Sequence, residues 1–295
     1  AQNGHDVTII DAMPKLGGML RYGIPEYRLP KEILQKEIDL IAKMGVKMET
    51  NTKVGVDVSF ESIKNKYDAV LMTIGAWSSI GLHCKGDDTP GVMGGIDFLE
   101  KIAKSKTINL GESVAVVGGG NVAMDAARTA LRLGAEVHVV YRRSEAELPA
   151  RAEEVHHAKE EGIIFDLLTN PTEILADENG WVKGIKCVKM ELGEPDASGR
   201  RKPVEIEGSE FVMDLDAVIM SLGTSPNPLI SSTTKGLEIN KRKCIVAEEE
   251  NGQTSKEGVY AGGDAVTGAA TVILAMGAGK AAAKGIDEYL SGKNN

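Results

Sequence analysis

Glycines near the middle of the chain have the spacing of a dinucleotide-binding turn. Gly118, Gly120 and Ala123 fit the pattern GxGxxA, and an apolar run that starts at Ser113 leads into them. Gly118 would form the turn, Gly120 would let a diphosphate reach the N-terminus of the next helix, and Ala123 would let that helix pack close to the strand. The spacing therefore predicts a dinucleotide site. A strand–turn–helix unit without a ligand is the alternative interpretation.

The residues after the next predicted strand indicate which dinucleotide would bind. Sites for NAD place a carboxylate there, which binds the ribose 2′-hydroxyl. This chain has Tyr141-Arg142-Arg143 at that point, followed by Arg151. Guanidinium groups bind a phosphate dianion through paired, charge-assisted hydrogen bonds. The pattern therefore predicts NADPH rather than NADH, and a solvated basic strand end is the alternative.

A carboxylate also follows an apolar strand near the N-terminus. The run from His5 to Ile10 is closed by Asp11, as in the second half of a nucleotide-binding βαβ unit, where the acid binds ribose hydroxyls. The glycine-rich turn of that unit is expected upstream of Ala1. An ordinary strand that ends in Asp is the competing interpretation.

A second carboxylate, Asp264, comes directly after a predicted strand and the pair Gly262-Gly263, and a helix is expected from about Thr271. Such a carboxylate can accept hydrogen bonds from a polyol, and the positive end of a helix can stabilise negative charge on a reduced ring system. A further strand–turn–helix unit without a ligand explains the same residues.

The elements that must position these residues follow from the spacing of apolar residues. Residues 16–30, rich in glycine and proline, are expected to form a loop. The predicted helices are Lys31–Met44, Phe60–Lys66, Ile96–Ala103, Val122–Leu133 and Thr271–Leu290. The predicted strands are Val46–Thr50, Tyr67–Ile74, Ser113–Gly118, Glu136–Tyr141, Ile163–Leu168, Gly184–Leu192, Phe211–Met220 and a short strand after Gly258. This alternation predicts an α/β protein in which residues 96–225 form one domain, inserted between the two parts, 1–95 and 226–295, of another.

Composition excludes several classes of function. The formal net charge of −9 argues against nucleic acid or an anionic membrane as the main partner. The three cysteines, Cys84, Cys187 and Cys244, form no CxxC and no metal-binding pattern. His156 and His157 are adjacent, so these two side chains lie on different faces of a helix. The spacing of these residues therefore predicts no metal ligands. No secretion signal and no membrane-spanning stretch are expected, so we predict a cytoplasmic protein.

Seven segments, taken in order, match one family: Asp11, 16–25, 28–30, 73–76, 118–123, 141–143 and 262–264. In these residues the chain resembles the small chain of NADPH-dependent glutamate synthase and its relatives, which include the electron-entry part of dihydropyrimidine dehydrogenase and bifurcating ferredoxin:NADP transhydrogenases. The resemblance covers nearly the whole chain.

The resemblance implies a glutathione-reductase-like fold with two Rossmann-like nucleotide-binding domains, in which an NADPH domain (96–225) is inserted into a discontinuous FAD domain (1–95 and 226–295). It implies FAD and NADP as cofactors. It places Asp11 near the adenosine ribose, Val54 near the adenine, Gly75 beside the diphosphate, and Asp264 towards the ribityl chain. The full set of expected cofactor-binding residues is Asp11, Gly18, Met19, Arg28, Val54, Gly75, Gly118, Gly120, Asn121, Val122, Arg142, Arg143, Arg151, Gly223, Gly263, Asp264, Thr271 and Val272.

The resemblance also implies an activity, in which hydride passes from NADPH to FAD and electrons pass on to iron–sulfur carriers. The family acts on CH–NH2 donors with NADP as acceptor, and its partner is the glutamate synthase large chain or another iron–sulfur acceptor.

The family's first GxGxxG and its cysteine-rich iron–sulfur domain are expected upstream of Ala1, so we expect an FAD domain truncated at its first βα unit. An NADP-binding module without turnover is one alternative. A thioredoxin-reductase-like enzyme is another, disfavoured by the lack of CxxC.

Overall fold

The computed structural model describes residues 1–105, 107–195, 197 and 199–293. The chain forms two compact units. The first unit comprises Ala1–Arg21, Glu26–Ser78 and Thr224–Asn295, and the second unit comprises Tyr22–Pro25 and Ser79–Gly223. The domain limits at residues 95 and 225 stay a prediction.

A parallel sheet of five strands organises the second unit. Its strand order is β5 (Val92–Gly94), β13 (Ala217–Met220), β6 (Ser113–Val117), β7 (Glu136–Tyr141) and β8 (Ile164–Leu167). The central strand β6 is apolar and almost wholly buried. A continuous apolar run of this kind is typical of a parallel strand that is covered on both faces.

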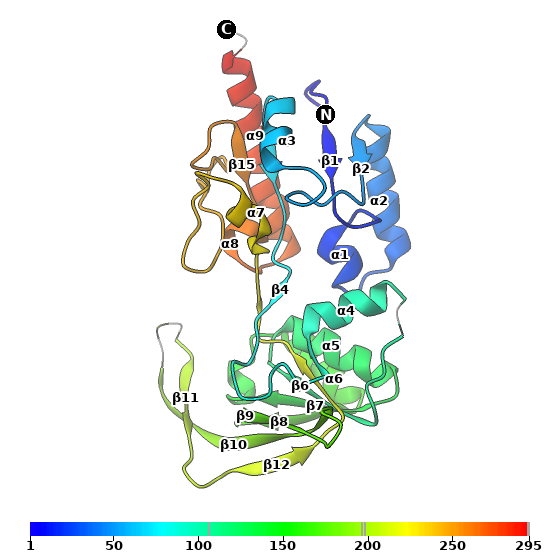
Figure 1. Ribbon diagram of the computed structural model, residues 1–295, viewed down its shortest axis with the longest axis vertical. Coiled ribbons are helices and arrows are strands. Elements are labelled where there is room, and N and C mark those ends of the chain that lie inside the picture. The colour runs from blue at the N-terminus through cyan, green and yellow to red at the C-terminus, as the bar shows by residue number, and fades with distance from the viewer. Residues whose placement is uncertain (106, 196, 198, 294–295) are drawn as a thin grey trace. The chain divides into compact units, whose positions relative to one another are not determined.

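Three helices cover one face of this sheet: α4 (Gly95–Ala103), α5 (Asn121–Arg132) and α6 (Ala152–Glu160). Figure 1 shows them on the side of the sheet opposite β10 and β12. Phe98 from α4 and Met124 from α5 are fully buried in one apolar cluster that also contains Val137 and Val139 of β7. The α5 helix consists largely of good helix formers, and Gly134, with φ +98°, follows its C-cap in the left-handed region that glycine favours.

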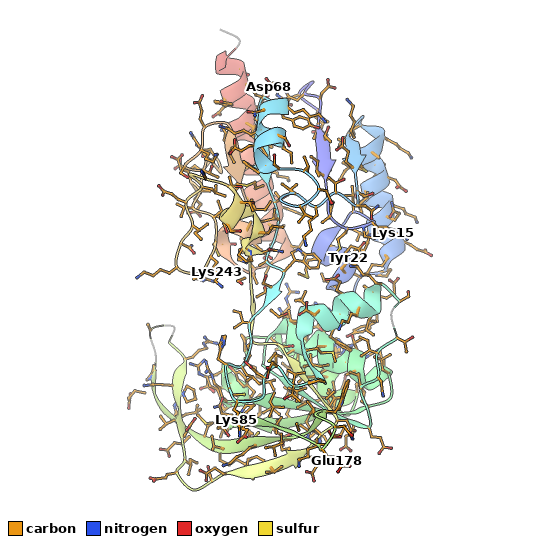
Figure 2. The ribbon with its side chains drawn as sticks, in the orientation of Figure 1. Lys15, Tyr22, Asp68, Lys85, Glu178 and Lys243 are labelled. Atoms are coloured by element: carbon orange, nitrogen blue, oxygen red, sulfur yellow. The ribbon has the colours of Figure 1, made fainter. Side chains whose placement is uncertain are left out.

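An antiparallel sheet covers the other face. It consists of β9 (Thr169–Ala176), β10 (Val182–Pro195), β11 (Arg201–Glu205) and β12 (Phe211–Asp214). Ile185 and Cys187 of β10 pack in one buried cluster with Val140 and Val218 of the parallel sheet. Lys85, labelled in Figure 2, ties the segment before β5 to β9, because its ammonium group lies 2.5 Å from a carboxylate oxygen of Glu173.

The first unit contains two short parallel sheets. In one, β1 (Thr8–Ile10) pairs with β2 (Lys47–Glu49), and in the other β3 (Val70–Met72) pairs with β15 (Val259–Ala261). Its helices are α1 (Gly18–Tyr22), α2 (Lys31–Lys43), α3 (Phe60–Lys66), α7 (Pro228–Thr233), α8 (Asp264–Thr267) and α9 (Val272–Lys293), and α1 ends on the first residue of the second unit. Phe60, Met72 and Val259 are buried in its core. The two remaining short strands, β4 (Ser78–Ser79) and β14 (Thr224–Ser225), pair with each other.

The α/β class is confirmed, but some predicted elements were wrong. Residues 211–220, predicted as one strand, form β12 and β13, which belong to different sheets. The break falls at Asp216, whose carboxylate accepts hydrogen bonds from the backbone N–H groups of Glu112 and Ser113 at 2.7 and 3.0 Å. The helix α1 lies within the segment predicted as a loop, and the missed elements are β4, β5, β9, β11, β14, α7 and α8. Within the described ranges, no helix combines the length and the apolar character needed to cross a membrane.

Candidate nucleotide-binding site

The glycine turn lies where β6 and β13 end side by side. Gly118 has φ +138°, and a Cβ atom there would lie 2.3 Å from the carbonyl oxygen of Ser221, which follows β13. The neighbouring backbones are held by a hydrogen bond from the Ser221 N–H to the Val117 carbonyl at 2.8 Å. Only glycine fits at position 118 without moving one of these two strand ends.

Gly120 occupies a different environment. It is the N-cap of α5, with φ −90°, and a Cβ atom there would meet no atom of the described residues within 4 Å. No side-chain hydrogen bond from the described residues caps α5, and its first turn contains no acidic residue. The first N–H groups of a helix lack partners within the helix and carry its positive dipole end. The open space at Gly120 and the uncapped N–H groups beyond it therefore fit a diphosphate.

The segment from Arg142 to Arg151, here called the arginine loop, is fastened beside this turn. The Tyr141 hydroxyl donates to the Glu147 carbonyl at 2.8 Å, and the Ser144 and Glu147 side chains form a reciprocal capping box. The Ala150 N–H donates to the Gly119 carbonyl at 3.1 Å. The loop is thus held to the nucleotide turn through Gly119 and to the end of β7 through Tyr141.

The three predicted phosphate-binding arginines have unequal surroundings. Arg142 and Arg151 are exposed, and Arg151 is the N-cap of α6. Arg143 is only 6% exposed, and its Nε donates to the Arg201 carbonyl of β11 at 2.8 Å. Arg142 and Arg151 are therefore open to an anion from solvent, whereas Arg143 is engaged with the antiparallel sheet.

Ser221 is a buried polar residue that the sequence analysis did not single out. It is 8% exposed, and its hydroxyl has no hydrogen-bond partner among the described residues. A Cβ atom at Gly95, the first residue of α4, would lie 2.4 Å from this hydroxyl. The only signal in the sequence is its place after an apolar strand and before Gly223, which has φ +120° and whose carbonyl accepts from the Ile80 N–H at 3.0 Å.

In the first unit, the predicted FAD residues form separate groups. Asp11 follows β1, and its carboxylate accepts from the Met13 N–H at 2.8 Å, while its carbonyl accepts from the Thr52 N–H at 3.0 Å. The bond from Thr52 places Asp11 beside the segment that contains Val54. Gly18, with φ +50°, begins α1 and Met19 follows in it.

The second group lies where β3 and β15 end. The Gly262 N–H donates to the Met72 carbonyl at 3.2 Å, and Gly75 and Asp264 follow these two strands. The Asp264 carboxylate accepts from the Ala270 N–H at 3.2 Å, and its partial burial raises its pKa above the ordinary value. A half-buried carboxylate beside a helix start fits the hydroxyls of a polyol.

Gly263, with φ +70°, packs against α9, because a Cβ atom there would lie 3.6 Å from the Ala275 side chain. Thr271 and Val272 are exposed at the start of that helix, and Arg28 is half-buried before α2. Among the described residues no strand pairing joins the β1–β2 sheet to the β3–β15 sheet.

The cysteines of the described chain are all free. Cys187 is fully buried, and this burial raises the pKa of its thiol to about 12, so it is an unreactive thiol at neutral pH. The described residues contain no group of three side chains that would hold a metal ion.

The sequence and the fold both resemble those of known proteins. Residues 1–279 match the family described as pyridine nucleotide-disulphide oxidoreductase. The chain is 47% identical over 294 residues to the NADP(+)-dependent formate dehydrogenase subunit beta of Moorella thermoacetica, covering 98% of this chain and 41% of that protein. It is 36% identical over 306 residues to the glutamate synthase [NADPH] small chain of Escherichia coli, covering 98% of this chain and 64% of that one.

A solved structure of FprA from Mycobacterium tuberculosis superposes with a TM-score of 0.85 at 20% identity, covering 98% of this chain and 79% of FprA, which shows the shared fold. The resemblance to the glutamate synthase small chain and the predicted fold class are thereby confirmed. The chain spans less than half the length of the formate dehydrogenase subunit. The chain belongs to the pyridine nucleotide-disulphide oxidoreductase family.

Proposed function

We propose that this chain is the NADPH- and FAD-binding part of an oxidoreductase that takes hydride from NADPH and passes electrons onward to an iron–sulfur acceptor. The observation that carries this proposal is the open N-terminus of α5 at Gly120, which no side chain in the described part of the chain caps, next to the exposed Arg142 and Arg151. The family match and the relatives named for NADP(H) support it.

In the second unit, the proposed roles follow from position. The backbone N–H groups of Asn121 and Val122 face the diphosphate at the positive end of α5. Arg142 and Arg151 bind the 2′-phosphate, which NADH lacks. Gly118 keeps the turn tight, and Gly223 lets the backbone after β13 approach the nucleotide closely.

In the first unit, we assign Asp11 and Val54 to the adenosine end of FAD, Gly18, Met19 and Arg28 to its length, and Gly75 to the diphosphate. The residues assigned to the ribityl chain and the ring are Gly263, Asp264, Thr271 and Val272. Bound FAD supplies an acceptor for hydride and a store that can release single electrons. The protein's own part is to hold the two nucleotides and to accept hydrogen bonds at Asp264.

We propose the electron acceptor only as a class, an iron–sulfur protein. One relative is named as a small chain and another as a subunit beta, which supports work beside a partner subunit. The glutamate synthase large chain, with chemistry on CH–NH2 donors, is one candidate partner, and the relative named as a formate dehydrogenase subunit supports a partner of another kind as the alternative. We place the protein in the cytoplasm because its cysteines are free thiols.

The test is an anaerobic mixture of FAD and NADPH with the chain extended at its N-terminus by the expected first βα unit of the FAD domain. We expect the visible absorbance of bound flavin to bleach on addition of NADPH, and to bleach much more slowly with NADH. Nucleotide binding without flavin uptake or bleaching would refute the oxidoreductase proposal and leave a nucleotide-binding module.

A further inference from the structure

Asn121 joins the two halves of the proposed nucleotide site. It is the first residue of α5 and is exposed. Its side-chain oxygen Oδ1 accepts a hydrogen bond from the backbone N–H of Arg151 at 3.0 Å, although the two residues are 30 positions apart. The side chain therefore reaches from the helix that faces the diphosphate to the arginine loop.

The contact adds to the bonds that already fix the Arg151 backbone, whose carbonyl accepts from the Glu154 and Val155 N–H groups at 3.0 and 3.2 Å. As the N-cap of α6 it makes no side-chain capping bond to the described residues of that helix. The preceding residue, Ala150, is tied to the Gly119 carbonyl. Two successive N–H groups of the arginine loop are thus held by the nucleotide turn, one by its backbone and one by the Asn121 side chain.

We propose that Asn121 is a positioning residue for cofactor selectivity: its amide oxygen fixes the Arg151 backbone beside the start of α5, from where the exposed guanidinium group can reach the 2′-phosphate. This inference rests on the proposed function and changes the role of the Asn121 side chain from a direct cofactor contact to a support for Arg151. An arginine held in place loses less conformational entropy when it binds, so the phosphorylated nucleotide gains affinity and its unphosphorylated counterpart does not.

The test is calorimetric titration of the 295-residue chain with NADP+ and with NAD+. The variants are Asn121→Ala, Arg151→Ala, the double variant and Asn121→Asp. We expect Asn121→Ala to weaken NADP+ binding about fivefold, the effect of one net hydrogen bond, and to leave NAD+ binding almost unchanged. In the Arg151→Ala background, Asn121→Ala should add no further loss, because its effect acts through Arg151.

Asn121→Asp keeps an oxygen acceptor for the Arg151 N–H. At low salt its charge should weaken NADP+ more than NAD+, because it also repels the 2′-phosphate, whereas at high salt the ratio of NADP+ to NAD+ affinity should return to the wild-type value, which it should not do in Asn121→Ala. Asn227→Ala is the matched control, because it removes a similar bond, from the Leu229 N–H to Asn227 Oδ1 at 2.9 Å, in the first unit. It should change neither affinity.

Two results would overturn this inference and leave the proposed function standing. One is an equal loss of NADP+ and NAD+ affinity in Asn121→Ala, and the other is additive losses of NADP+ affinity in the double variant. Either one would mean that the Asn121 side chain touches a part common to both nucleotides or acts independently of Arg151. A wild-type chain that binds both nucleotides equally, or neither, would instead refute the proposed function, so the two failures are distinguishable.

Discussion

At the scale of single residues, the two adjacent arginines after β7 differ in solvent exposure and in hydrogen bonding. Arg142 is exposed, whereas Arg143 donates to the Arg201 carbonyl and is buried. The side chain of Arg143 is already hydrogen-bonded to a carbonyl, whereas the exposed side chain of Arg142 can bind an incoming anion. Selectivity for a 2′-phosphate should therefore depend on Arg142.

Arg142→Ala should weaken NADPH binding about tenfold or more and leave NADH binding within about twofold, because a charge-assisted hydrogen bond contributes about 1.5 to 3 kcal/mol. Fluorescence titration with both nucleotides measures this. Arg242→Ala removes an exposed arginine from the first unit and controls for the change in net charge. Equal losses for the two nucleotides would refute the assignment of Arg142.

Glu161 links α5 to α6 and makes the fold sensitive to acid. Hydrogen bonds from Arg132 and Arg128, with contacts of 2.6 and 2.7 Å, lower the pKa of its carboxyl from 4.5 to about 2. Because the pKa in the folded state lies below the unfolded value, the carboxylate stabilises the fold above about pH 4.5. That contribution is lost as the pH falls through 4.5 towards 2.

Glu161→Gln should lower the free energy of unfolding by about 2 kcal/mol at neutral pH. The difference from the wild type should shrink as the pH falls below 4.5, because Glu161 of the unfolded wild type binds a proton there, and it should vanish near pH 2, where the folded carboxylate is protonated too. Urea unfolding at several pH values measures both effects. Glu153→Gln, at an exposed position on the same helix, is the control. A difference that stays constant with pH would contradict the ion-pair explanation.

At the scale of elements, the unit β6–α5–β7 separates two roles of glycine. Gly118 is required by the fold, because a side chain there would meet the Ser221 backbone and its φ is +138°. Gly120 is required only if something binds, because the fold leaves open space there. One strand–turn–helix unit thus contains a structural glycine and a proposed ligand-binding glycine.

Gly118→Ala should destabilise the chain by about 3 kcal/mol through the strained backbone and the clash. Gly120→Ala should keep the stability within about 1 kcal/mol of the wild type, since its φ suits alanine. It should nevertheless abolish most NADP+ binding, because its methyl group occupies the space of the diphosphate. Urea unfolding combined with NADP+ titration separates the two variants. Unchanged NADP+ binding in Gly120→Ala would mean that α5 does not face the nucleotide.

Elements defined by local patterns could be predicted from the sequence, and those defined by distant contacts could not. The limits of β7 agree with the prediction, because alternating apolar residues and flanking turn residues specify it locally. The division of 211–220 into two strands depends on the contact of Asp216 with Ser113, 103 residues away. No local pattern contains that information.

The same distinction applies to the candidate site. The glycine turn follows from spacing, but the burial of Arg143 depends on β11, and the support of Arg151 depends on Asn121. The unpartnered hydroxyl of Ser221 could not be predicted either, because it results from the packing of β13 against the start of α4.

At the scale of the whole molecule, each compact unit has a core of its own. A ligand that binds one unit should therefore stabilise that unit against local opening and leave the other almost unchanged. NADP+ should slow amide hydrogen exchange in residues 113–151 and not in residues 1–21 or 259–293. FAD should produce the opposite pattern. Protection by NADP+ in the first unit alone would contradict the assignment of the two cofactors.

The central claim is that the second unit recognises a 2′-phosphate. The most direct measurement is a calorimetric titration of the unaltered chain with AMP and with AMP phosphorylated at the 2′-hydroxyl, which differ in that group alone. We predict that the phosphorylated compound binds at least about tenfold more tightly and that the difference shrinks as salt is added. Equal affinities at low salt would contradict the account.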